Sequence, residues 1–246
     1  MPLQYGTLVL ELSPADTGVN DSSRCIVQTD EGDVEAFVKR LSDPRKLVVE
    51  IACSVLGRRL GLPIPEPLVV FVPSGLGGPG LAFGGTAIAH PNLMVWVKQS
   101  DQRAVLDRLR SWQQLMPAAC FDEWIANCDR HAGNLIFDGI STFWLIDHDL
   151  AISRMISADQ IAPLNQLFGV AIEGLVESQL LTLRPKATGV MSSFRDHEVD
   201  PVRGLFDEAF WPMDVIDEVF NWLAGRQDHL VRLGNERIPA RQGGLF

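Results

Sequence analysis

The pattern of apolar residues changes near residues 90–98, and this change restricts the possible folds more than any other feature. Before it, short segments rich in β-branched residues alternate with turns, as is typical of strands: TLVLEL, RCIVQT and VEAFVKRL. After it, residues 101–127 and about 157–233 are typical of helices, with a short strand pair, LIFD and FWLIDHD, between them. We therefore expect an α+β fold, with a small antiparallel sheet in residues 1–95 and a larger, mainly helical part in residues 96–246.

One helix is predicted inside the strand-rich part. The segment SDPRKLVVEIACSVLGRRLG, residues 42–61, opens with an Asp that can cap a helix and a Pro at the first turn. Its apolar residues recur at helical spacing, and the glycine at its end is typical of a helix stop. The next segment, LPIPEPLVVFVP, contains four prolines and is expected to be extended.

Composition excludes several classes of protein. The chain has 246 residues, of which 46% are hydrophobic, so it can bury a sizeable core, yet it contains no apolar run long enough to span a membrane. The first residues do not resemble a secretory signal, and the four cysteines form no CxxC pair, so we expect reduced thiols in a cytoplasmic protein. Because the formal net charge is −10, we expect no direct contact with nucleic acid.

A polar loop, NCDRHAGN, lies between an apolar helix and an apolar strand. Asp129 and Asn134 stand five positions apart in it, and Asp147 follows at the end of the next strand. Phosphoryl transfer from ATP needs a carboxylate that orients the acceptor hydroxyl and oxygen ligands that hold magnesium. This order predicts that Asp129 faces the acceptor while Asn134 and Asp147 bind Mg²⁺, as an Asp, an Asn and a later Asp do in protein kinases.

The strand-rich part offers a cation for the phosphates of ATP. Lys39 ends an apolar strand, and Glu50 follows eleven residues later in the predicted helix, where it could hold the lysine. Glu50 could equally pair with Lys46, one turn earlier in the same helix. A phosphate-covering loop is expected between the first two strands, with amides and hydroxyls supplied by four residues: Gly18, Asn20, Ser22 and Ser23.

These motifs resemble those of the HipA-like and phosphatidylinositol-kinase-like branches of the kinase superfamily. The resemblance rests on DRHAGN followed by LIDHD, and on FVKRL followed by EIACSVLGRRLGLPIPEP, and it covers roughly residues 15–152. It implies a bilobal kinase-like fold with ATP between the lobes, Asp129 as the catalytic aspartate, and Asn134 and Asp147 as magnesium ligands. It also implies that Lys39 and Glu50 anchor the phosphates. The best-known members of the family phosphorylate Ser or Thr on proteins, and some modify themselves in the phosphate loop.

The neighbours of these residues allow more than one interpretation. We group His131 with Asp129 in the predicted catalytic loop, and favour a brace that holds the loop by hydrogen bonds over a general base. Arg130 either orients a carboxylate or lies in solvent. Asp149 either helps Asp147 bind metal or begins the next turn, which we favour slightly, and His148 is not expected to be a ligand.

Two rival functions stay open. Aminoglycoside and choline kinases also place an Asn five residues after the catalytic Asp, although they usually carry a His two residues before it, where this chain has Asn127. Such an enzyme would phosphorylate a small molecule. The second rival is a catalytically inactive kinase-like binding module, which the absence of a GxGxxG phosphate loop suggests. The leading hypothesis is an ATP- and Mg-dependent kinase that acts on Ser or Thr of a protein, and the chain itself is one candidate acceptor.

Overall fold

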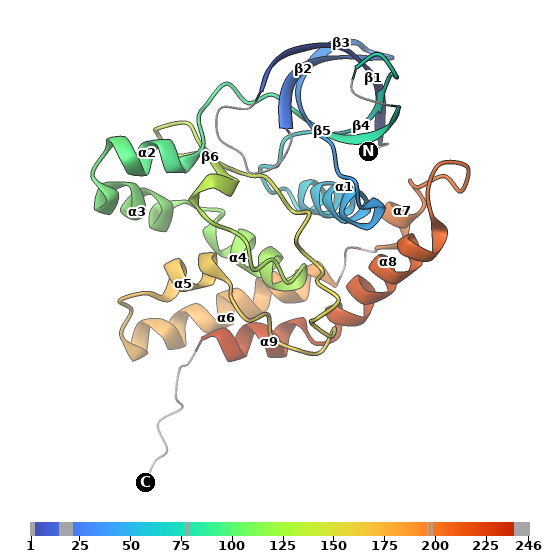
Figure 1. Cartoon of the computed structure of the whole chain (residues 1–246). Helices are drawn as coiled ribbons and strands as arrows, with labels where there is room; N and C mark the ends of the chain where they lie inside the picture. The colour runs from blue at the N-terminus through green and yellow to red at the C-terminus, as the bar shows by residue number, and fades with distance from the viewer. Residues whose placement is uncertain (1–2, 15–21, 77–78, 196, 198, 239–246) are drawn as a thin grey trace.

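The computed structural model describes residues 3–14, 22–76, 79–195, 197 and 199–238. In the N-terminal part, five strands form a closed barrel (Figure 1). Around the barrel the order is β1 (Gln4–Pro14), β2 (Ser22–Thr29), β3 (Gly32–Lys39), β5 (Gly80–Thr86) and β4 (Pro67–Val72). Neighbouring strands are antiparallel except β1 and β4, which pair in parallel and close the sheet. The prediction of a simple antiparallel sheet is therefore wrong in this respect.

The barrel has a small apolar core of its own. Because side chains alternate along each strand, one face of every strand points inward. The inward residues are nearly all aliphatic: Leu8, Cys25, Val27, Ala36, Val38, Leu68, Val70, Val72 and Ala82. Glycine is required at one point of this wall, because a Cβ on Gly84 would lie 2.8 Å from Val70 Cγ2 and 3.2 Å from Leu68 Cβ. Strands β4 and β5 can pack closely there only without that side chain.

Helix α1 (Pro44–Arg59) lies below the barrel and contacts β4 and β5 on one side and α7 and α8 on the other (Figure 1). Its start follows the predicted chemistry, since the Asp43 carboxylate accepts a hydrogen bond from Arg45 N at 2.9 Å and Pro44 occupies the first turn. All residues from 47 to 57 are buried, including Glu50. A helix that is buried on every side has no solvent face, so a charged residue within it needs a partner inside the protein.

The rest of the chain is mainly helical, as predicted. A one-turn 3₁₀ helix (Ala132–Asn134) and the strand pair β6 (Leu135–Phe137) and β7 (Phe143–Leu145) interrupt the helices. The helices are α2 (Leu93–Gln99), α3 (Gln102–Ser111), α4 (Leu115–Trp124), α5 (Gln166–Ile172), α6 (Glu177–Phe194), α7 (Asp200–Arg203), α8 (Met213–Gln227) and α9 (Leu230–Arg237). Within the described part of the chain, no helix has the length and apolar character needed to cross a membrane.

The helices differ from the prediction at two places. Helix α2, capped by Asn92, was not predicted, and it lies near residue 95, where the boundary between the strand-rich part and the helical part was expected. The position of that boundary therefore stays a prediction. The helix predicted from residue 157 begins only at residue 166. Buried Arg226 of α8 donates to the carbonyls of Ser157, Ala158 and Gln160 at 3.3, 3.2 and 2.6 Å, which holds the preceding segment as a loop.

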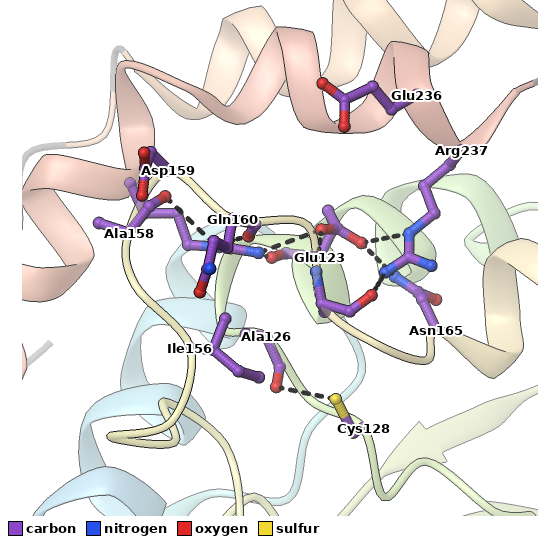
Figure 2. A network of polar contacts seen from close by, with 12 residues as sticks. Glu123, Ala126, Cys128, Ile156, Ala158, Asp159, Gln160, Asn165, Glu236 and Arg237 are labelled. Carbon is purple, nitrogen blue, oxygen red and sulfur yellow. Dashed lines mark hydrogen bonds and ion pairs between the residues drawn. The ribbon is translucent and has the colours of Figure 1, made fainter.

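A buried ion-pair network secures this loop to the helices (Figure 2). Its centre is Glu123 of α4, whose carboxylate binds Arg226 of α8 at 3.1 Å and Arg237 of α9 at 2.8 Å. The same carboxylate accepts the backbone N–H of Ala162 at 3.2 Å. A buried carboxylate with two arginine partners and a backbone donor is fully compensated, so the network holds α4, α8 and α9 together with the loop that precedes α5.

Candidate active site

Lys39 gathers three carboxylates from distant parts of the chain. It is the last residue of β3 and only 7% exposed. Its ammonium contacts Asp147 Oδ1 directly, Asp149 Oδ1 at 3.0 Å and Glu50 Oε2 at 3.7 Å. We call these four residues the Lys39 cluster. The cluster joins the barrel, α1 and the segment after β7, so the predicted convergence of Lys39, Glu50 and Asp147 is present in the structure.

The charged groups of the Lys39 cluster shift one another's pKa values. Burial by itself would lower the pKa of Lys39, but the carboxylates of Glu50, Asp147 and Asp149 outweigh burial and raise it. Burial would raise the pKa of Glu50, but hydrogen bonds and charge from His148, together with Lys39, lower it. Burial, helped by the hydrogen bond with Asp147, raises the pKa of Asp149 despite Lys39. Lys39 therefore stays cationic and Glu50 anionic over the neutral range.

Asp147 and Asp149 belong to a tight segment after β7. Asp147 has a φ of +64°, a left-handed conformation that Asp tolerates better than most residues. Asp149 is 4% exposed and also lies 3.7 Å from Lys46 Nζ. The sequence suggested Lys46 as a partner of Glu50, but the structure pairs Lys46 with Asp149. Asp149 begins a turn, as favoured, and at the same time belongs to the Lys39 cluster.

Asp129 and Asn134 are held together in the polar loop. Asn134 Nδ2 donates to the Asp129 backbone carbonyl at 2.8 Å and to its carboxylate at 3.2 Å. The Asp129 N–H donates in turn to Asn127 Oδ1 at 3.0 Å. Asn127 therefore braces the loop from the position where the small-molecule kinases carry a histidine. These contacts fix the Asp129 carboxylate in one direction.

His131 is exposed, and its Nδ1 accepts the N–H of Gly133 at 2.9 Å. This contact agrees with the favoured interpretation of His131 as a brace within the loop. The two serines of the predicted phosphate loop, Ser22 and Ser23, are partly buried at the start of β2, and Ser22 is the strand partner of Lys39. Gly18 and Asn20 lie outside the described residues.

Arg130 is the residue whose role the sequence left undecided. It is 1% exposed, and its guanidinium binds the Asp122 carboxylate with two hydrogen bonds of 3.0 and 3.1 Å. Its Nη1 also donates to the carbonyls of Asn134 and Ile146 at 3.1 and 2.5 Å. Because Ile146 N donates to Asn134 O at 3.2 Å, Arg130 joins the polar loop to the residue just before Asp147.

The oxygen atoms of this region fit a hard divalent cation. Glu50, Asp147 and Asp149 each offer a carboxylate oxygen, and these three atoms lie within 4.8 Å of one another. Both hydrogen bonds from Asn134 to Asp129 use Nδ2, so the amide oxygen is the atom that a cation would take. Carboxylate and amide oxygens are the protein ligands that Mg²⁺ prefers.

A separate groove of about 610 Å³ lies away from these residues. Its wall consists of residues at and just before the start of β1, in β4 and in the segment after α7: Leu3, Tyr5, Phe71, Gly204, Leu205, Asp207 and Phe210. It shares no residue with the Lys39 cluster or the polar loop. The groove is therefore separate from the candidate active site.

Comparisons with known proteins bear on the fold and the family of the chain. The chain is similar to the crystal structure of the Helicobacter pylori proinflammatory kinase CtkA, with a TM-score of 0.58 and 12% identity over 91% of this chain and 93% of that chain. At that identity the likeness shows a kinase-like fold and nothing more specific. No curated protein matches the sequence. Residues 14–164, more than half of the chain, match the family described as HipA-like kinase, and the chain therefore belongs to the HipA-like kinase family.

Proposed function

We propose that the chain is an ATP- and Mg-dependent phosphotransferase that acts on Ser or Thr of a protein. The observation that carries this proposal is the Lys39 cluster, in which the lysine of β3 meets Asp147, 108 positions later in the chain. The Lys39 ammonium is a buried cation where the barrel meets the segment after β7, and the phosphates of ATP are anions that such a cation can bind. The Ser or Thr acceptor is an inference from the family.

Each residue has a distinct task in this proposal. Lys39 binds the α- and β-phosphates, and the carboxylate of Glu50 holds the Lys39 ammonium in position. Asn134 and Asp147 would hold Mg²⁺, which neutralises charge on the phosphates when bound. Asp129 accepts a hydrogen bond from the acceptor hydroxyl and orients its oxygen, and the contact with Asn134 keeps the carboxylate in place. Arg130 positions the loop through Asp122.

The direct test is ATP consumption in the presence of Mg²⁺ by the wild type, Asp129→Asn and Asp129→Ala. We expect both variants to lose at least about a hundredfold in rate, because an oriented catalytic group typically contributes 10²–10⁴-fold. Asp30→Ala, an exposed position in the β2–β3 turn, is the control and should keep the wild-type rate. Equal rates for the wild type and the Asp129 variants, with circular dichroism unchanged, would contradict the role of Asp129.

The acceptor needs a second experiment. Intact-mass measurement after incubation with ATP and Mg²⁺ reports transfer to the chain itself, and Ser22→Ala and Ser23→Ala locate the site if it is in β2. Ser22 is a candidate acceptor because it is the strand partner of Lys39. A screen with labelled ATP against proteins and small alcohols then separates a protein kinase from a small-molecule kinase. Absence of any labelled product would favour the inactive binding module.

A further inference from the structure

His148 lies between two members of the Lys39 cluster and is fully buried. Its backbone N–H donates to Glu50 Oε2 at 2.8 Å, and its imidazole Nδ1 lies 3.3 Å from Glu50 Oε1. The Lys39 ammonium is farther from Glu50, at 3.7 Å, and contacts Asp147 and Asp149 more closely. His148 therefore contacts both carboxylate oxygens of Glu50, and Lys39 is a third and more distant partner.

The hydrogen bonds define the state of the imidazole. An ionised carboxylate can only accept hydrogen bonds, so Nδ1 must carry the hydrogen that faces Glu50. Nε2 is buried and has no hydrogen-bond partner among the described residues. The 3.3 Å contact with Glu50 Oε1 therefore places a donor hydrogen on Nδ1.

This arrangement solves a problem that phosphate binding creates. If Lys39 leaves its carboxylates to bind phosphate, Glu50 loses the one lysine that contacts it among the described residues, while it remains 1% exposed in the middle of α1. A buried carboxylate without partners is strongly destabilising. The two donors of His148 keep both Glu50 oxygens satisfied, so α1 can stay attached to the segment that carries Asp147.

We propose that His148 is a positioning residue: its backbone N–H and its Nδ1–H fix Glu50, and they thereby keep α1 attached to the segment that carries Asp147 while Lys39 changes partners. The kinetic part of this inference rests on the proposed phosphotransfer, whereas the hydrogen-bonding part does not. It predicts that the donor at Nδ1 matters for turnover more than for folding.

Three variants separate positioning from mere packing. His148→Phe keeps a ring but removes the Nδ1 donor, and Glu50 retains Lys39 and the backbone N–H of residue 148, so we expect only a small fall in melting temperature. We expect kcat to fall about tenfold or more, the equivalent of one hydrogen bond to a charged group, with a smaller change in KM for ATP. His148→Asn carries an amide donor near the place of Nδ1 and should recover most of the loss. His229→Phe, before α9, is the matched control and should change neither value.

Measurements that need no turnover test the same contact. In protein labelled with ¹⁵N-histidine, the signal that disappears in His148→Phe should show a hydrogen on Nδ1. Hydrogen exchange in residues 47–57 should be faster in His148→Phe than in the wild type. In His148→Asn the exchange rate should return toward that of the wild type. An Nε2–H tautomer, unchanged exchange, or a wild-type kcat in His148→Phe would each overturn the proposal. If the wild type consumes no ATP, the phosphotransfer proposal fails, while tautomer and exchange still decide the role of His148.

Discussion

At the scale of single residues, the contacts of Arg130 yield a stability prediction. Asp122 is 0% exposed and takes two hydrogen bonds from this arginine. Arg130→Met leaves that carboxylate buried without a cation, so we expect a loss of about 3–5 kcal/mol in the free energy of unfolding, measured with urea. Arg232→Met, in an exposed pair with Glu236, should lose less than about 1 kcal/mol.

A double variant checks the cause of that loss. In Arg130→Met with Asp122→Leu, neither charge of this pair remains, and replacement of a buried ion pair by apolar residues is often neutral. The double variant should therefore be more stable than Arg130→Met alone. If it were less stable, the loss would come from packing or from the carbonyls of Asn134 and Ile146 instead of the stranded carboxylate.

The residues that sequence could predict are those whose spacing is local. The step from Asp129 to Asn134, and the place of Asp147 after a strand, depend on a few consecutive residues and their chemistry. The hydrogen-bonding role of His148 was not predicted, because its partner Glu50 lies 98 positions away and no local pattern reports that distance. The role of Arg130 also stayed open, because no local pattern shows that its side chain contacts Asp122 and the carbonyl of Ile146.

At the scale of elements, Glu218 joins α8 to α1 and to the segment after the candidate metal site. It binds Arg45 of α1 at 2.9 Å and Arg154 at 2.6 Å. Arg45 also donates to the carbonyl of Ile152 at 2.5 Å. Ile152 has a φ of +52°, which is unusual for a β-branched residue, so its conformation must be held by such contacts.

This contact predicts a dependence of stability on pH. The hydrogen bond from Arg154, with Arg45, lowers the pKa of Glu218 to about 2. A lowered pKa means that the stabilisation is complete above the ordinary value for Glu and is lost as pH falls toward 2. Glu218→Gln should therefore lose no more than about 1 kcal/mol near pH 6, since the side chain is partly exposed. The difference from the wild type should shrink below pH 4.5, measured by urea unfolding at several pH values. A difference that grows in acid would contradict the assignment.

Helix prediction succeeded where the caps are local and failed where tertiary contacts compete. Residues 44–59 form α1 with the expected Asp43 cap. Residues 157–165 do not form a helix, because Arg226 and Glu123 take up their backbone groups from α8 and α4. Helix α2 was missed because its seven residues are few for a periodic pattern.

At the scale of the whole molecule, closure of the barrel was beyond sequence analysis. The parallel pairing of β1 with β4 joins Gln4 to Leu68, and neither strand carries a signal for a partner so distant. The segments that form β1, β2, β3 and β4 were predicted as strands or extended chain, but the closure of the barrel was not predicted. The same non-local packing places Lys39 beside the segment after β7, so the candidate site depends on how the barrel and the helices meet.

Binding of Mg–ATP should therefore stabilise the molecule as a unit. A ligand held by Lys39 of the barrel and by Asn134 and Asp147 of the helical part opposes unfolding of both, by about 2.7 kcal/mol at a hundredfold excess over its Kd. For a chain of this size we expect the melting temperature to rise by about 5–10 °C. Asn134→Ala and Asp147→Ala should remove most of the increase that depends on Mg²⁺, whereas Asp30→Ala should keep it. Differential scanning calorimetry with Mg²⁺ or with EDTA measures both. An equal rise in EDTA, or in the two variants, would contradict a magnesium site formed by these residues.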